Sequence, residues 1–309
     1  MRKKLYNCKT MNIERADKKV CTKKIEVKKK LTFSLEVFPP KDDLDGEKLN
    51  ILIEELKKLK QYEPSLVSIT YGAGGMGSKD KTLACAKKIK EELKLNCMPH
   101  FTCINSTNDF VLNYITEIEK LGFDHILALR GDKTKDEQVQ NDLKSDFQFA
   151  SDLIKFIKTN SSINISAAGY PEGHNEAESL NEDLKILKLK TELGASSIYT
   201  QLFFDNEKFY KYFEKARSLK IGTPIIPGIL PITSFKQTFK MIEMCNVSIP
   251  KQLFQKLEKY QDEKHAIFEI GFEHACSQIK GLQDFGVNEA HFYTLNKASS
   301  TKNILKECL

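Results

Sequence analysis

LTFSLEVF at residues 31–38, GEKLNILIEELKKLK at 46–60 and LVSITYG at 66–72 follow one another in the chain. The first and third stretches are short and rich in β-branched, aromatic and other apolar residues, which is typical of strands, whereas the second has apolar residues at helical spacing. A strand, a helix and a second strand in this order indicate a parallel pair with a crossover helix. The chain is therefore predicted to be an α/β protein.

The same alternation continues along the rest of the chain. Further candidate strands are NCMPHFTCI (96–104), HILALRG (125–131), NISAAGYP (164–171), SIYTQLFF (197–204), PIIPGIL (224–230) and EAHFYTL (289–295). Helical stretches separate them. In one, at 176–193, Leu180, Leu184 and Leu187 share a face, and the gap at 231–288 holds at least two helical patterns. Eight strands with helical crossovers and no Pro/Gly/Ser-rich linker predict a single (β/α)8 barrel of the TIM type rather than an open sheet.

Charge separates an N-terminal extension from this barrel. Residues 1–30 hold 12 of the 48 Lys and Arg residues but 3 of the 42 Asp and Glu residues, which leaves 36 basic and 39 acidic residues for the rest. We therefore expect a basic, flexible extension at 1–30 and a catalytic barrel at 31–309. The extension has no aromatic interleaving beyond Tyr6, which argues against a nucleic-acid or membrane partner. No apolar run approaches the roughly 20 residues of a membrane span and no secretory signal is seen, so we expect a cytoplasmic protein.

The cysteines favour reduced thiols over a disulfide framework or a metal centre. Eight cysteines are scattered without a CxxC pair. Cys97, His100 and Cys103 lie close together in the sequence, but residues of an extended strand alternate between its two faces. His100 is therefore expected to point away from both thiols, and no metal site is predicted.

The segment GAGGMG at 72–77 matches the pattern G-x-G-x-x-G between a strand and a helix. A dinucleotide fingerprint also needs an acidic residue at the end of the next strand, and that strand ends at Asn105. We therefore interpret the glycines as a loop that lets a planar ring approach the backbone.

Polar residues lie near the carboxyl ends of the candidate strands, where the active sites of barrel enzymes are found. In the first strand, Ser34 and Glu36 share one face and the apolar residues share the other, so Glu36 is expected to point into the barrel. Such a glutamate is either an ion-pair partner, for instance of Arg130, or a general acid. The residues alone leave both interpretations open.

Eight blocks resemble, in order, those of the bacterial-type methylenetetrahydrofolate reductases. They are SLEVFPPK (34–41), VSITYGAGG (67–75), PHFTCI (99–104), ILALRGD (126–132), ISAAGYPEGHNEA (165–177), TQLFFD (200–205), IIPGILPITSFKQ (225–237) and HFYTLNKA (291–298). One block alone is weak evidence, but eight in register over residues 31–300 are specific. The resemblance covers the catalytic barrel of this family.

The resemblance implies a flavoenzyme that reduces 5,10-methylenetetrahydrofolate to 5-methyltetrahydrofolate and so feeds methionine synthesis. It implies bound FAD, NADH or NADPH as reductant, and a ping-pong cycle. Glu36 and Asp132 match catalytic positions, with Glu36 the acid that opens the folate ring. The positions that match FAD contacts are Thr70, Tyr71, Ala73, His100, Arg130, Gly131, Asp132, Ala150, Tyr170, His174, Ala177, Asp183 and Lys190.

On the substrate side, Gln201, Gln237 and Lys297 match positions that face folate. Lys297 departs from the family pattern, which usually has an arginine there, and a lysine cannot form the bidentate fork of a guanidinium. Ile186 and Leu189 replace polar positions that help hold FAD in relatives.

Two other interpretations remain open at this point. One is another flavin-dependent barrel of the proline dehydrogenase type, and the other is a non-catalytic subunit that binds folate or flavin. The expected partners are small-molecule substrates and further copies of the chain in a homo-oligomer.

Overall fold

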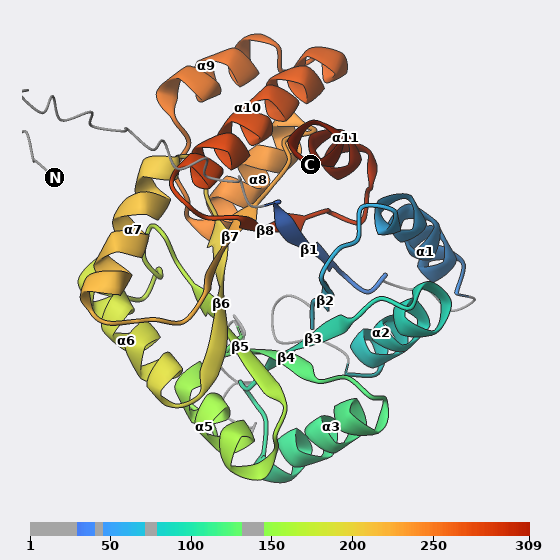
Figure 1. The fold of residues 1–309 in the computed structure, drawn as a ribbon, viewed down its shortest axis with the longest axis vertical. Coiled ribbons are helices and arrows are strands. Elements are labelled where there is room, and N and C mark those ends of the chain that lie inside the picture. The colour runs from blue at the N-terminus through green and yellow to red at the C-terminus, as the bar shows by residue number, and fades with distance from the viewer. Residues whose placement is uncertain (1–29, 41–45, 72–78, 132–144) are drawn as a thin grey trace, which may run out of the picture.

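A computed structural model describes residues 30–40, 46–71, 79–131 and 145–309. Eight strands form a closed barrel in chain order, and each strand is parallel to its neighbours (Figure 1). The strands are β1 (Thr32–Val37), β2 (Val67–Ile69), β3 (Cys97–Thr102), β4 (His125–Leu129), β5 (Asn164–Gly169), β6 (Ala195–Leu202), β7 (Ile225–Ile229) and β8 (Glu289–Tyr293). The predicted (β/α)8 barrel and all eight predicted strands are confirmed, with ends that differ by a few residues.

Helices surround the barrel and connect its strands (Figure 1). They are α1 (Glu47–Lys60), α2 (Lys79–Leu93), α3 (Asn108–Lys120), α5 (Ala150–Asn160), α6 (Leu180–Glu192), α7 (Asn206–Ser218), α8 (Phe235–Cys245), α9 (Lys251–Lys259), α10 (Lys264–Asp284) and α11 (Ser299–Cys308). Each ring helix turns an apolar face to the sheet, as α6 does with the buried Leu184 and Leu187. Within the described residues, no helix is long and apolar enough to cross a membrane.

The main apolar core lies between the strands and the helices. Phe33, Leu35 and Val37 of β1 belong to it, and each is no more than 3% exposed. Side chains of the opposite parity point into the barrel, where Met98, Leu127 and neighbouring residues form a smaller apolar cluster. The predicted division of β1 into an outer apolar face and an inner polar face is therefore confirmed.

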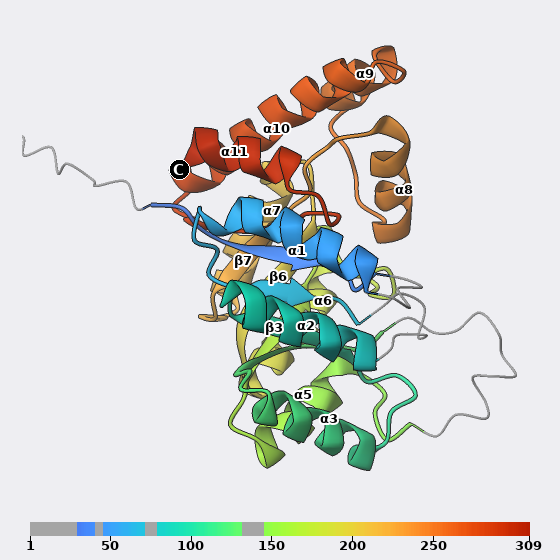
Figure 2. The same cartoon turned by 90° about the vertical axis from the view of Figure 1, so that its right-hand side faces the viewer.

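The crossover from β7 to β8 is longer than the others. It holds α8, α9 and α10, so the prediction of at least two helices in this gap is confirmed. Figure 2 shows these helices stacked on one side of the barrel. They pack on a second apolar core, which includes Leu253, Leu257 and Ile267 together with Leu202 at the end of β6. Gly271 brings α10 close to the backbone of Ile232, because a Cβ at this position would collide with the Ile232 carbonyl.

Candidate active site

Glu36 lies inside the barrel between two buried histidines. Its Oε2 is 3.4 Å from Nε2 of His291 on β8 and 3.8 Å from Nε2 of His100 on β3. The Glu36 side chain is 15% exposed, whereas the two imidazoles are 1% and 5% exposed. The expected inward orientation of Glu36 is confirmed, and the carboxylate lies between imidazoles from two other strands.

A hydrogen-bonded chain orients His291 toward Glu36. His291 Nδ1 lies 2.7 Å from the hydroxyl oxygen of Ser34, and Ser34 also bonds the Tyr199 side chain. When Ser34 donates to Nδ1, the imidazole carries its proton on Nε2, facing the Glu36 carboxylate. The Tyr199 ring packs against the imidazole at 4.9 Å between centroids. Tyr199, Ser34, His291 and Glu36 thus form a connected polar path inside the barrel.

His100 is buried and neutral. Burial lowers its pKa to about 4, against the opposing pull of Glu36. Its Nε2 has no hydrogen-bond partner among the described residues. The thiols of Cys97 and Cys103 face the other side of β3, where Cys97 donates to the Ala86 carbonyl on α2 at 3.5 Å. The predicted alternation of this segment is confirmed.

A second polar cluster follows β4 and β5. The Arg130 guanidinium forms a forked ion pair with Glu176, with a distance of 2.7 Å from Nη2 to Oε1. Lys190 Nζ donates to the Ala168 carbonyl at 3.2 Å and lies 5.9 Å from the centre of the Tyr170 ring. The cluster therefore gathers two cations at the carboxyl ends of neighbouring strands.

Helix α6 supplies both Asp183 and Lys190 to this cluster. Ser179 caps the helix by accepting a hydrogen bond from the Glu182 N–H, and residues seven apart then share a face. Burial raises the pKa of Asp183, although Lys190 and His174 oppose the shift. Burial lowers the pKa of Lys190, and Asp183 opposes that shift. A buried acid and a buried base compensate each other here.

His174 completes the cluster beside Tyr170. The two rings are in edge contact at 4.7 Å, and His174 Nδ1 accepts from the Glu176 N–H at 3.1 Å. Burial lowers the pKa of His174, and the Asp183 carboxylate opposes that shift. The Ala177 N–H donates to the His174 carbonyl, so the predicted residues of this loop lie together.

The other predicted cofactor residues are distributed around the same end of the barrel. Thr70 follows β2 and accepts a hydrogen bond from Thr82 through its carbonyl, and Ala150 is the first residue of α5. Gly131 has a φ of 90°, and a Cβ there would collide with Thr102. Tyr71 differs, because its ring packs against Phe101 and Tyr114 outside the barrel.

The predicted substrate residues lie on three different segments of the chain. Gln201 lies on β6 and its Oε1 accepts a hydrogen bond from the Leu202 N–H at 2.9 Å. Gln237 lies in the first turn of α8, and the exposed Lys297 lies between β8 and α11. Ala73 and Asp132, together with the glycine segment 72–77, fall outside the described residues.

Sequence reasoning missed His291, its partner Ser34, and Glu176. Alternation predicts that His291 and Tyr293 share the inward face of the last strand, so the signal for His291 was present. Glu176 forms its ion pair with a residue 46 positions away, and local pattern carries no signal for such a pair. Ile186 and Leu189 are 48% and 41% exposed on α6.

A closed eight-stranded barrel with a part-buried carboxylate inside it and a cluster of paired charges at its carboxyl end defines a (β/α)8-barrel enzyme. The methylenetetrahydrofolate reductase family model matches residues 21–308. The 5,10-methylenetetrahydrofolate reductase of Escherichia coli (strain K12) is 37% identical over 273 residues, which are 88% of this chain and 89% of that relative. The chain belongs to the methylenetetrahydrofolate reductase family.

Other similar proteins include a longer plant relative and a solved structure. Methylenetetrahydrofolate reductase (NADH) 1 of Arabidopsis thaliana is 34% identical over 284 residues, which are 88% of this chain and 47% of that relative. A Clostridium thermocellum protein described as binding two copies of 5-methyl-5,6,7,8-tetrahydrofolic acid superposes with a TM-score of 0.65. It is 14% identical and covers 91% of this chain and 95% of its own, so it supports the fold alone.

Proposed function

We propose that this protein reduces 5,10-methylenetetrahydrofolate to 5-methyltetrahydrofolate, with NADH or NADPH as reductant and FAD as bound cofactor. Family membership supports the reaction and sets aside the proline dehydrogenase type. The observation that carries the proposal is the part-buried Glu36 carboxylate, which lies between two histidines inside a barrel whose mouth also carries the paired charges of Arg130 and Glu176. An acid in this place is what opening of the folate ring requires.

The polar cluster after β4 and β5 fits FAD. Arg130 and Lys190 would hold the pyrophosphate through charge-assisted hydrogen bonds, and Asp183 favours the charged form of the buried Lys190, against the lowering of its pKa by burial. The buried, unpartnered Nε2 of His100 is a polar atom that needs a partner from outside the described chain. The remaining positions of the proposed site are Thr70, Tyr71, Ala73, Gly131, Asp132, Ala150, Tyr170, His174 and Ala177. When bound, FAD would supply the chemistry of hydride transfer between the nicotinamide and the folate.

Glu36 acts on the folate. One carboxylate oxygen accepts the Nε2 proton of His291, which leaves the other oxygen to carry a proton into the barrel. Glu36 transfers that proton to a ring nitrogen of the folate. The bond between this nitrogen and the one-carbon unit then breaks, and the one-carbon unit becomes electrophilic. His291, Ser34 and Tyr199 then provide a path that returns a proton to Glu36.

The substrate side of the proposal places Gln201, Gln237 and Lys297 against the folate, and Asp132 against the flavin ring. We further propose that the protein works as a cytoplasmic homo-oligomer and supplies methyl groups for methionine synthesis. Size-exclusion chromatography with light scattering and cell fractionation test the first two statements.

Anaerobic absorbance measurements test the reaction itself. The purified protein should carry a flavin band that NADH or NADPH bleaches and that methylenetetrahydrofolate restores, with 5-methyltetrahydrofolate as product. A protein that lacks the band but binds folate would instead be a non-catalytic subunit. A band that methylenetetrahydrofolate does not restore would refute the proposed reaction.

A further inference from the structure

The turn after β8 has a strained backbone and lies directly beside Glu36. Leu295 and Asn296 follow each other in the left-handed region, with φ values of 50° and 59°. A leucine rarely adopts this conformation, and such residues persist only where several contacts hold them, most often at functional sites. Strand β8 is paired with β1 up to Tyr293, which lies opposite Glu36. The strained turn therefore begins just after the pair of residues that includes the proposed acid.

Thr294 fixes the backbone of Glu36 from this turn. Its N–H and its hydroxyl group both donate to the Glu36 carbonyl oxygen, at 3.3 and 2.7 Å. The Thr294 hydroxyl oxygen in turn accepts the Asn296 N–H at 3.1 Å. The backbone of Glu36 is thus connected to Asn296 through the hydroxyl group of the buried Thr294.

The side-chain amide of Asn296 continues the contact with β1 after β8 has ended. Its Oδ1 accepts the Phe38 N–H at 2.9 Å, and its Nδ2 donates to the Phe38 carbonyl at 2.8 Å. A primary amide has the donor and the acceptor of a peptide group, so it takes the place of the strand backbone that is missing here. Pro39 and Pro40 follow and carry no N–H, so the Phe38 N–H is the last backbone donor before them that can hold the end of β1.

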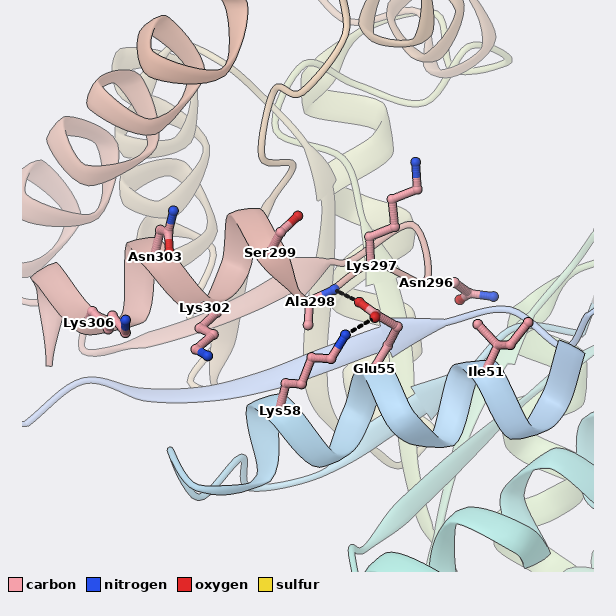
Figure 3. Close-up of a pocket in the computed structure, with 10 residues that line it drawn as sticks. All are labelled: Ile51, Glu55, Lys58, Asn296, Lys297, Ala298, Ser299, Lys302, Asn303 and Lys306. Atoms are coloured by element: carbon pink, nitrogen blue, oxygen red, sulfur yellow. Dashed lines mark hydrogen bonds and ion pairs between the residues drawn. The ribbon is translucent and has the colours of Figure 1, made fainter. Parts of the chain in front are cut away.

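Helix α1 fixes the other end of the turn. Glu55 accepts the N–H of Ala298, the residue before α11, at 2.7 Å. Figure 3 shows this bond, with Asn296 and Lys297 beside it in the same turn. Burial tends to raise the pKa of Glu55, but the hydrogen bonds from Ala298 and from Lys58 hold it below its usual value. The ionised carboxylate therefore anchors the turn on α1, as Thr294 and Asn296 anchor it on β1.

We propose that Asn296 is a positioning residue for Glu36. Its amide keeps the carboxyl end of β1 from fraying and so holds the Glu36 carboxyl group at the place from which it protonates the folate. The inference rests on the proposed function, in which Glu36 is the acid. A misplacement of about 1 Å can slow a reaction on the order of 10²-fold, so a bond two residues from the acid affects the rate.

The test measures the two half-reactions separately by anaerobic stopped-flow absorbance. Asn296→Gly keeps a residue that readily adopts the left-handed backbone, but it removes both hydrogen bonds to Phe38. Reoxidation of the reduced flavin by methylenetetrahydrofolate should slow by about tenfold to 10²-fold, whereas flavin reduction by NADH or NADPH should stay within about twofold. The dependence on folate concentration should show the loss in the maximal rate and not in the apparent dissociation constant.

A second variant is Asn296→Asp. It keeps the acceptor for the Phe38 N–H but loses the donor to the Phe38 carbonyl, so it should show the same selective loss at a smaller size. The matched control is Asn246→Gly, because Asn246 also has a left-handed backbone, with a φ of 50°, but is the C-cap of α8. This control should keep both rates.

A double-mutant cycle separates positioning from a general structural role. In a protein that already carries Glu36→Gln there is no acid to position. Addition of Asn296→Gly should then cause no further loss in the rate of flavin reoxidation. A residue that only stabilises the barrel would instead add its loss to that of Glu36→Gln.

Amide hydrogen exchange, followed by mass spectrometry, reports on β1 without any turnover. Peptides that contain β1 and Phe38 should exchange faster in Asn296→Gly than in the unmodified protein or in Asn246→Gly. Circular dichroism melting shows that each variant is folded at the temperature of the measurement.

The outcomes separate the two proposals. Equal losses in both half-reactions, or a full further loss in the Glu36→Gln background, would overturn the positioning role and leave the reductase proposal intact. Unchanged exchange of β1, or a similar loss of rate in Asn246→Gly, would also overturn it, because Asn296 would then not act through the strand. A reduced flavin that methylenetetrahydrofolate does not reoxidise in the unmodified protein would refute the proposed function itself.

Discussion

Replacement of Glu36 by glutamine is the sharpest test of the site, because the two halves of the proposed reaction place different demands on this residue. The amide has the same shape as the carboxylate, and its oxygen can still accept the Nε2 proton of His291 across 3.4 Å. The side chain is 15% exposed, so the change leaves the barrel packing in place. What the amide cannot do is give a proton to the folate.

The expected loss follows from that chemistry. Positioned acids accelerate reactions roughly 10²- to 10⁴-fold, which corresponds to about 2.7–5.5 kcal/mol of activation free energy. Reduction of methylenetetrahydrofolate by the reduced flavin should slow by that factor in the variant. Reduction of the flavin by NADH needs orientation but no proton on the folate side, so its rate should stay within about tenfold. Anaerobic stopped-flow absorbance measures both half-reactions in one instrument.

A matched control is Glu172→Gln. Glu172 is similarly buried at 12% exposure, but it accepts hydrogen bonds from Ser248 and pairs with Lys208 rather than facing the barrel interior. This variant should turn over nearly normally. Equal losses of both half-reactions in the Glu36 variant would mean that Glu36 is structural, and no loss in either would remove it from the mechanism.

Three further predictions follow from the other features of the chain. Arg130→Ala or Lys190→Ala should weaken FAD binding by about tenfold or more, because each removes a charge-assisted hydrogen bond; an unchanged affinity in a fluorescence titration would refute the assignment. Burial lowers the pKa of His100 and His274 to about 4. As the pH falls, both histidines therefore become protonated in the unfolded chain before they do so in the folded protein. The free energy of unfolding should therefore fall as pH drops from about 6.5 to about 4, and His274→Gln should make that fall shallower by up to one proton in urea titrations; parallel curves would contradict this. Deletion of residues 1–28 should leave flavin content and turnover nearly unchanged, whereas loss of FAD would show that the extension packs on the barrel.

The alternation of apolar and polar residues was enough to predict the barrel and the inward direction of Glu36. That periodicity reports which face of a strand is buried, and in a closed barrel the other face can only point inward. The same rule places His291 beside Glu36, yet a histidine in an apolar strand gives no sign of its partner until β8 is paired with β1.

Other parts of the site depend on packing that local pattern does not encode. Arg130 was expected to face a cofactor, and the structure shows that it pairs with Glu176 from a different loop. Tyr71 follows a strand end as expected, but its ring is drawn into an aromatic cluster with Phe101 and Tyr114. Burial of large apolar area outweighs the polar preference of one hydroxyl there.

The seam between β1 and β8 also constrains how the protein is made. It joins Thr32 to Glu289, so nearly the whole chain must be synthesised before this pairing exists. Until then β1 and β7 are the two edges of an open sheet, and each exposes backbone groups that pair readily with another chain. Contacts of such long sequence separation form slowly, which prolongs the exposure. A chain that stops short of residue 289, by nonsense mutation or proteolysis, keeps both edges open and is therefore expected to aggregate rather than to persist as a smaller folded unit.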